Sequence, residues 1–186
     1  MSTQTISVEP ITCPQCKTLL NPVSHAVSHP VPPPAAHRSA EWIPLIRSAV
    51  QEVFEKMLGC EVVDRDAAPL EKSDLSAMVG LAGELVGMMA VCCDKPAACA
   101  VAGRMLGEEP PEIDDCVRDA LGEVCNMVAG SFKARVPGLE KGCSLSVPTV
   151  LTGADYRLHS LAGVVHFAVS FSFDGLPFWI TLDLHE

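Results

Sequence analysis

Two runs of alternating side chains near the C-terminal end constrain the fold of this chain most. Over residues 165–173 and again over 176–184, large apolar residues occupy every second position, and mostly smaller or polar residues lie between them. A period of two is typical of β-strands with one buried face. Only Asp174 and Gly175 separate the runs, and Asp-Gly in this context is the strongest short hairpin signal. The sequence therefore predicts an antiparallel sheet with one apolar face, which other elements must cover.

The rest of the chain carries signals for helices and three more strands. Helical spacing and capping residues mark three helices, whereas apolar runs broken by glycine or alternating with serine indicate strands. The predicted elements, in chain order, are a helix from Glu41 to Gly59, two strands within 75–93 that meet near Gly83, a helix over 94–106, a helix over 113–135, and a strand over 144–148 before the hairpin. The first helix places on one face Ile43, Ile46, Val50, Val53, Phe54 and Met57, and the N-cap candidates of the next two are Asp94 and Asp114. The order predicts an α+β fold: an antiparallel sheet with helices packed on one face.

The predicted helix over residues 113–135 separates into two faces at 100° per residue. Asp119, Glu123 and Asn126 fall within an arc of roughly 60°, about one turn apart. The apolar residues fall within an arc of roughly 100°, wide enough to face a core. They are Val117, Leu121, Val124, Cys125, Val128 and Phe132. A carboxylate and a carboxamide therefore stand side by side in water, and burial of the helix requires neither of them.

Two glycines flank this polar face, at Gly122 and Gly130. Each costs about 1 kcal/mol relative to alanine inside a helix. A missing side chain beside a polar pair allows another backbone to approach closely. By pattern alone, the face is either an ordinary solvated surface with two tolerated glycines or a polar pair presented to a partner.

Composition excludes several classes of function. With 186 residues, 48% of them apolar, the chain can bury one good core. Its formal net charge of −10 argues against nucleic acid as a partner, because phosphate neutralisation needs a surplus of Lys and Arg. No apolar run of membrane-spanning length and no signal-peptide pattern occurs, so no membrane partner is expected. The nine cysteines lie largely within apolar patterns, which indicates buried thiols in a reducing compartment and predicts a cytoplasmic protein.

The first 40 residues differ from the rest, which predicts a tail over 1–40 and a folded domain over 41–186. The tail holds seven prolines, and residues 22–40 are expected to be extended. It also carries four candidate zinc ligands in the pattern C-x2-C-x8-H-x3-H, namely Cys13, Cys16, His25 and His29. These residue types suit tetrahedral zinc, but the loop between the pairs is shorter than usual and prolines interrupt any finger helix. A zinc site and a disordered tail without metal both remain open.

Other catalytic chemistry has little support in the sequence. The chain contains no phosphate-binding loop, no dinucleotide-binding fingerprint and no nucleophile elbow. Cys92 and Cys93 lie within an apolar strand pattern, which indicates packing. Asp119 and Glu123 share one helix face, a poor arrangement for an acid and a base on opposite sides of a substrate. The acid–amide pair of Glu123 and Asn126 is what remains.

The pattern Asp119-x3-Glu123-x2-Asn126-x21-Pro148 resembles the signature of the CheC/CheX/FliY family of chemotaxis phosphatases. In that family, D/S-x3-E-x2-N-x21-P marks the active helix and the strand after it. All four positions fit at the family's spacing. The predicted strands and the terminal hairpin are also similar, so the resemblance covers about 41–186 and implies a CheC/CheX-like fold.

The number of asparagines narrows the resemblance to one branch of the family. Members with two active sites carry a second E-x2-N helix. Besides Asn126 this chain has only Asn21, which lies in the tail without a glutamate three residues before it. The chain therefore resembles the single-site CheX branch.

The resemblance implies dephosphorylation of the phospho-aspartate of a CheY-like response regulator. In this role Asn126 orients the attacking water, and Glu123 engages a lysine of the receiver. Asp119 is implied as a supporting residue at the helix edge, and Pro148 as one that shapes the neighbouring strand. Mg²⁺ is supplied by the receiver, so this chain needs no metal for the reaction. Homodimers that join through their sheets are also implied.

Two rival hypotheses come from other classes of function. The chain could be a non-catalytic adaptor that docks on receiver domains or on a flagellar-switch-like assembly. Alternatively the tail is primary, as a zinc-bearing docking segment with the domain as its scaffold. Which receiver is the substrate, and whether the pathway is motility or another two-component circuit, cannot be read from the residues.

Overall fold

Seven strands form one antiparallel sheet in the computed structural model, which describes residues 35–66, 73–153 and 164–185. The strand order is β1-β6-β7-β3-β2-β4, and β5 also pairs with β2. The strands are β1 (Val63–Arg65), β2 (Leu75–Gly83), β3 (Gly87–Cys93), β4 (Cys143–Leu145), β5 (Thr149–Thr152), β6 (Val164–Phe173) and β7 (Leu176–His185). The helices are α1 (Ala35–Val53), the π-helical turn η1 (Phe54–Leu58), α2 (Lys95–Leu106), α3 (Asp115–Arg135) and the short α4 (Leu139–Gly142).

The predicted terminal hairpin is present. β6 pairs with β7 from Val164 opposite His185 to Phe173 opposite Leu176. Asp174 and Gly175 form the turn with φ values of 49° and 80°, as a two-residue hairpin with matching twist requires. The two strands send alternate residues into the core: Phe167, Val169, Phe171 and Phe173 from β6, and Phe178, Ile180, Leu182 and Leu184 from β7.

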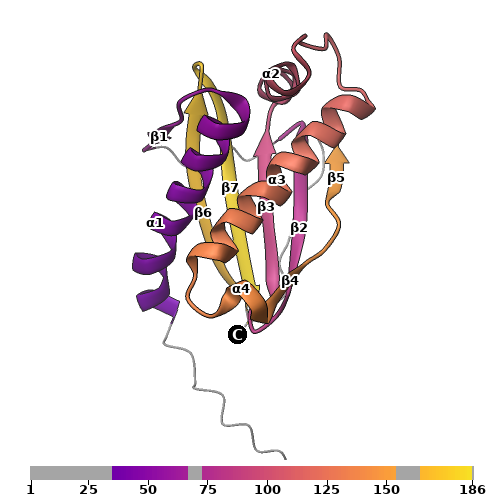
Figure 1. Ribbon diagram of the computed structural model, residues 1–186. Coiled ribbons are helices and arrows are strands. Elements are labelled where there is room, and N and C mark those ends of the chain that lie inside the picture. Colours follow the sequence, from indigo (N-terminus) through magenta and orange to yellow (C-terminus); the bar gives the residue numbers. More distant parts are fainter. Residues whose placement is uncertain (1–34, 67–72, 154–163, 186) are drawn as a thin grey trace, which may run out of the picture. The chain divides into compact units, whose positions relative to one another are not determined.

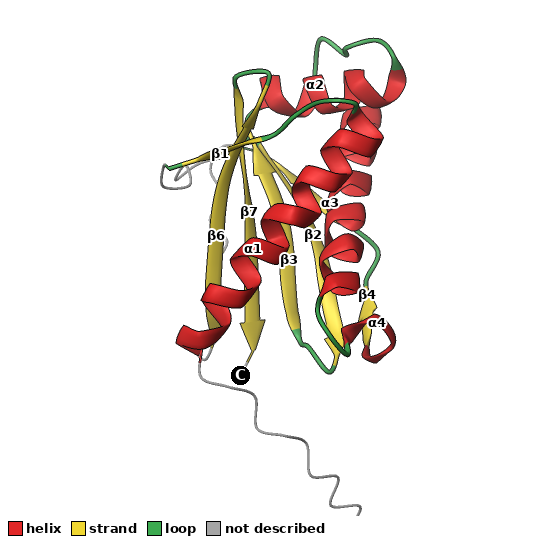
Figure 2. Ribbon diagram, turned by 60° about the vertical axis from the view of Figure 1, so that its left-hand side comes forward, coloured by secondary structure: helices red, strands yellow, loops and turns green. Residues whose placement is uncertain are grey.

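Helices α1 and α3 lie side by side on one face of the sheet (Figures 1 and 2). Their apolar sides and the facing sheet residues make one continuous core. The predicted α+β fold with helices on one face is therefore confirmed. A smaller apolar cluster of Ala90, Cys92 and Trp179 is buried separately from this core. No helix in the described part of the chain is long and apolar enough to cross a membrane.

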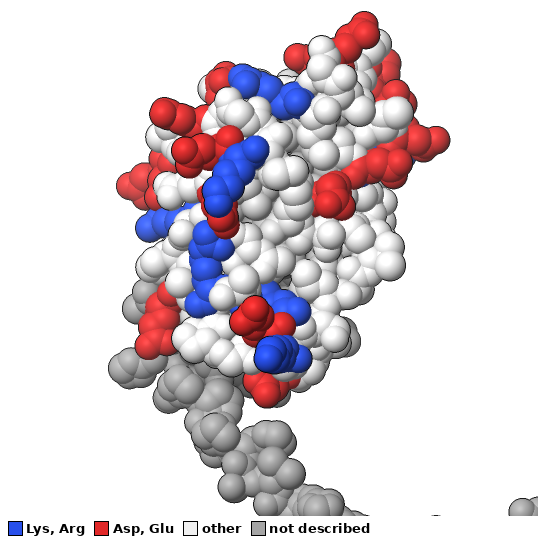
Figure 3. Space-filling model, viewed as in Figure 1, with Lys and Arg blue, Asp and Glu red and all other residues white. Residues whose placement is uncertain are grey.

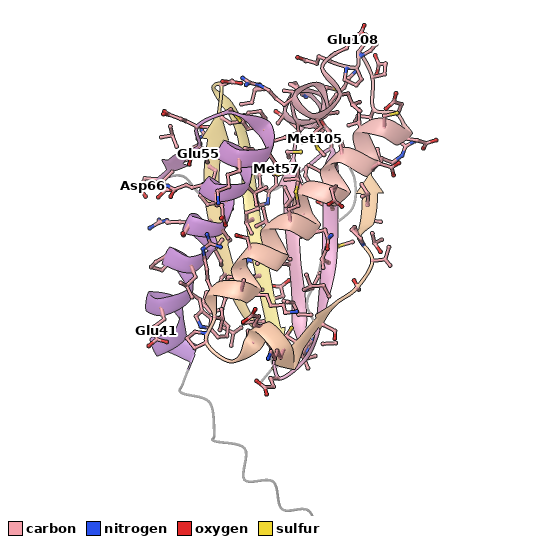
Figure 4. The ribbon with its side chains drawn as sticks, viewed as in Figure 1. Glu41, Glu55, Met57, Asp66, Met105 and Glu108 are labelled. Atoms are coloured by element: carbon pink, nitrogen blue, oxygen red, sulfur yellow. The ribbon has the colours of Figure 1, made fainter. Side chains whose placement is uncertain are left out.

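The first helix differs from the expectation at both ends. α1 begins at Ala35, so 35–40 are helical although an extended segment was predicted there. Alanine-rich sequence after prolines explains this start, because alanine is the best helix former and proline is tolerated at a helix start. At the other end, the wider turn of η1 shifts the helical phase, so Leu58 is buried and Met57 is 55% exposed. Met57 is labelled in Figure 4. The prediction that Met57 lies in the core was wrong.

The strand predicted over 144–148 is interrupted. β4 ends at Leu145, and β5 begins only at Thr149. Pro148 has no N–H to give to a strand ladder, so the chain leaves the regular pairing before it. β1 and β5 lacked a clear sequence signal because both are short. The division of the chain at residue 40 stays a prediction, since residues 1–34 lie outside the described part.

Candidate active site

Helix α3 has the two faces that its sequence predicts. All six residues assigned to its apolar side are buried: Val117, Leu121, Val124, Cys125, Val128 and Phe132. The helix starts where expected, because the Asp114 carboxylate accepts a hydrogen bond from the Val117 N–H at 2.9 Å. Lys133 and Arg135 in its last turn suit the negative end of the helix dipole. Core packing thus fixes which side of α3 faces solvent.

On that solvent side, Asp119 and Glu123 are exposed and Asn126 is half-buried. Neighbours three or four positions apart on a helix have Cβ atoms about 5–6 Å from each other, so the three side chains form one polar row. The nearby Arg118 forms an ion pair with Asp115, with 2.5 Å between Arg118 Nη2 and Asp115 Oδ1. Within the described residues, no hydrogen bond or ion pair is made by the side chains of the polar row. The row is therefore free to meet groups from another molecule.

The surroundings of the polar row are acidic. Exposed acids extend from the end of α2 into the first turns of α3: Glu108, Glu109, Glu112, Asp114 and Asp115. In Figure 3 acidic side chains gather at the upper right, over this part of the surface. Lys95 pairs with Glu112 at 2.5 Å and Arg118 pairs with Asp115 at 2.5 Å, which neutralises two of them. The remaining negative charge favours a partner with cationic groups.

Both glycines of α3 face the chain's own edge strands. A Cβ atom added to Gly122 would lie 3.4 Å from Pro148 Cβ and 3.5 Å from Val150 Cγ2. A Cβ atom added to Gly130 would lie 3.9 Å from Leu145 Cδ1. The close approach expected beside the polar pair therefore exists, but it is made by the stretch between β4 and β5. Asn126 occupies the position midway between the two glycines, at i+4 from one and i−4 from the other.

A β-bulge shapes this stretch. β2 pairs with β4 at Leu81–Leu145 and with β5 at Met78–Thr149. Between these two pairs β2 has two residues, 79 and 80, whereas the segment that joins β4 to β5 has three, 146–148. The joining segment therefore carries one extra residue, which defines a bulge. The extra residue makes room for Pro148, which lies against Gly122 on α3, and the side chain before it, Val147, is 84% exposed. Sequence reasoning missed the bulge, although a proline in a strand pattern was a signal for it.

A second polar group ties α3 to α1. Ser131 Oγ donates to Glu52 Oε2 at 2.7 Å, and Arg135 Nη2 donates to the same oxygen at 2.6 Å. Arg135 also reaches Ser48 Oγ at 3.2 Å. Hydrogen bonds from Lys56, Ser131 and Arg135 lower the pKa of Glu52 to about 2. We call Glu52, Ser131 and Arg135 the helix clamp.

The cysteines of the described residues are free thiols, and all but Cys116 are buried. Burial raises the pKa of Cys92 to about 11 and that of Cys125 to about 12. The prediction that Cys92 and Cys93 serve packing agrees with this burial. His166, predicted on the surface, is exposed and pairs with Asp183.

No group of three or more His, Cys, Asp or Glu within residues 35–66, 73–153 and 164–185 is arranged to hold a metal. The candidate zinc ligands Cys13, Cys16, His25 and His29 lie outside the described residues.

Comparison with known proteins gives first a class of fold. A CheX crystal structure from Desulfovibrio desulfuricans is similar with a TM-score of 0.68 and 26% identity, over 78% of this chain and 99% of that one. A chain of the CheX–CheY–BeF3–Mg²⁺ complex from Borrelia burgdorferi is similar with a TM-score of 0.64 and 23% identity, over 78% of this chain and 98% of that one. The fold is therefore of the CheX/CheC-like class.

The family follows from the sequence match. Residues 75–172, more than half of the chain, match the family described as chemotaxis phosphatase CheX. The chain belongs to this family, which confirms the resemblance seen in the α3 motif. It is also 27% identical over 97 residues to the CheY-P phosphatase CheX of Thermotoga maritima. That alignment covers 52% of this chain and 63% of the relative's length.

Proposed function

We propose that this protein dephosphorylates the phospho-aspartate of a CheY-like response regulator, with Glu123 and Asn126 as the catalytic pair. The observation that carries the proposal is the polar row of α3, which is turned to solvent and has no partner within the described residues. The row lies within the stretch that matches the CheX family. The names of the relatives support the substrate: one is a CheY-P phosphatase, and another forms a complex with CheY.

Asn126 is proposed to orient the attacking water. A carboxamide can accept a hydrogen bond from water and donate one, and it does not titrate near neutral pH. An acyl phosphate is already reactive, so positioning an in-line nucleophile supplies most of what the reaction needs. Half-burial between Gly122 and Gly130 limits the freedom of this side chain, which favours a fixed water position.

Glu123 is proposed to engage the lysine of the receiver. Within the described part of the chain no cation pairs with its carboxylate, so an incoming ammonium meets an available anion. Asp119, one turn earlier, adds negative charge in a supporting role. Pro148 is proposed to support the site because it packs against Gly122 of α3. This contact sets how closely the segment between β4 and β5 approaches the helix.

The metal of the reaction is proposed to arrive with the substrate. Mg²⁺ would be held by the receiver, next to its phospho-aspartate, and this chain would add the water-positioning amide and the docking acid. The complex of the Borrelia relative contains CheX, CheY, BeF3 and Mg²⁺ together.

The test is phosphate release from a phosphorylated CheY-like receiver in Mg²⁺, with this protein, with its Asn126→Ala variant, and with neither. We expect the wild type to exceed the receiver's own rate and the variant to lose roughly 100-fold of that acceleration, as misplaced nucleophiles do. Circular dichroism and receiver binding serve as controls for the variant. Equal turnover by both proteins contradicts the assignment. Binding without any acceleration by the wild type favours the adaptor hypothesis.

Homodimerisation through the sheet and a cytoplasmic location stay predictions. Sedimentation of the purified protein measures its oligomeric state.

Metal analysis of the protein with and without residues 1–40 tests the tail. Zinc retained only by the full chain would support a zinc site at the cysteines and histidines of the tail.

A further inference from the structure

We propose that Val147 contacts the receiver domain and tightens docking next to Asn126. This inference rests on the proposed function, because it names a further contact at the same site. The partner chemistry that it implies is an apolar side chain on the receiver, bordering the phospho-aspartate that Asn126 approaches.

Val147 combines exposure with apolar character. Among the described large hydrophobic residues it has the highest exposed fraction, 84%. An exposed valine on a surface needs no explanation by itself. Val147 differs from an ordinary exposed valine in two ways: hydrogen bonds and packing fix its backbone, and its segment passes Asn126.

Hydrogen bonds of the preceding residue, Ser146, fix the backbone at Val147. The Ser146 N–H donates to the Gly80 carbonyl at 2.9 Å, and the Gly80 N–H donates back to Ser146 Oγ at 2.8 Å. The same hydroxyl donates to the Val147 carbonyl at 2.9 Å. Both the donor and an acceptor lone pair of Ser146 are thus spent on fixing the bulge.

The residue after Val147, Pro148, fixes the backbone on its C-terminal side. Pro148 has a restricted φ, and it lies against Gly122 of α3. Bulges re-aim a side chain out of the regular pleat and occur often beside active sites. Because Val147 is held between two anchored residues, its isopropyl group is displayed at a defined place with little freedom to lose on binding.

Two contacts bracket the position of Val147 along α3. Leu145 lies opposite Gly130, and Pro148 lies opposite Gly122. Asn126 is midway between these glycines on the same row of the helix. The chain from Leu145 to Pro148 therefore passes Asn126, and Val147 is the exposed apolar side chain on that passage.

This placement gives Val147 one effect when a receiver docks: its apolar surface leaves water, which favours the complex. The effect acts on the affinity for the receiver, so it should change KM and leave kcat at saturation nearly constant.

The experiment compares Val147→Ser with a matched variant, Val63→Ser, for KM and kcat on the phosphorylated receiver. Val63 is 63% exposed and belongs to β1, at the opposite end of the strand order from β4. We expect Val147→Ser to raise KM roughly 3- to 10-fold at unchanged kcat, because tenfold in affinity is about the value of one buried apolar group. Val63→Ser should change neither constant, and Val147→Ile should keep the wild-type KM. The melting temperature should stay the same in all three.

Equal KM values for the two serine variants overturn the inference, and so does a loss of kcat at unchanged KM. A separate measurement distinguishes these failures from failure of the proposed function. If the wild type binds the receiver without accelerating phosphate release, the dissociation constant replaces KM. Weaker binding by Val147→Ser then supports the contact, and equal binding refutes it. A wild type that neither binds nor accelerates refutes both proposals.

Discussion

Helix α3 carries two polar regions that differ in how their groups are satisfied. In the helix clamp, the Glu52 carboxylate accepts hydrogen bonds from Ser131 and Arg135, and both helices are joined. In the polar row, Glu123 and Asn126 make no such bond with any described residue. Both regions look alike in sequence, as polar residues at helical spacing. The comparison teaches that pairing, rather than polarity, separates residues that hold the fold from those that are available to a partner.

The two regions also depend on each other. The clamp fixes α3 against α1, and the core fixes its rotation, so the polar row is presented on a rigid element. Rigid placement is what a water-positioning amide requires, since small displacements cost large factors in rate. Substitutions in the row should therefore change activity at constant stability, and substitutions in the clamp should do the reverse.

Among substitutions that test the contrast between the polar row and the helix clamp, we expect the larger effect for Glu123→Gln. Removing the charge should raise KM for the phosphorylated receiver roughly tenfold, because an anion that would meet the receiver lysine is lost. The wild-type KM should rise with added NaCl, and that of the variant should respond less. Steady-state kinetics at two salt concentrations measures both. An identical salt dependence in the two proteins would show that Glu123 makes no charge pair with the receiver.

A smaller effect is expected for Arg135→Gln in the clamp. Its melting temperature should fall by roughly 2–4 °C, as expected for the loss of about one charged hydrogen bond in a chain of this size. At saturating receiver, kcat should stay within about twofold of wild type, since the group is remote from the reacting atoms. Lys133→Gln is the matched control, because it removes the same charge from the same turn without touching the clamp. Equal melting temperatures for the two variants would contradict the clamp's role.

The smallest effect is the acid dependence of the clamp. The pKa of Glu52 is lowered from 4.5 to about 2 by hydrogen bonds to Lys56, Ser131 and Arg135. A lowered carboxylate pKa contributes stability that is fully present above pH 4.5 and is lost as the pH falls towards 2. We expect the stability difference between wild type and Glu52→Gln to shrink across this window. Urea unfolding at pH 5.5, 4 and 3 measures it, and a constant difference would argue against the lowered pKa.

Local sequence predicted much of the fold. The hairpin at Asp174-Gly175, the caps at Asp94 and Asp114, and the buried face of α3 all depend on residues within a few positions of each other. Such signals can be read without knowing what packs where. The polar row was readable for the same reason, because helical spacing alone puts Asp119, Glu123 and Asn126 on one side.

Features that join distant segments could not be read in this way. The bulge at Val147 depends on the register of β4 and β5 against β2, more than 60 residues away. The clamp depends on the placement of α1 beside α3, and the role of Gly122 depends on which strand lies over it. The phase shift in η1, which exposes Met57, was likewise hidden from a strict helical period.

By itself, the sequence of this protein determined the element types, the apolar faces and the spacing of the acid–amide pair, because these follow from short-range geometry of the backbone. Tertiary structure alone decided that an edge-strand bulge packs against Gly122, one helical turn from Asn126, and that one set of polar groups on α3 is paired while another is left to solvent. Those outcomes require segments far apart in the chain to meet, and the energy of their packing is not encoded in any single stretch.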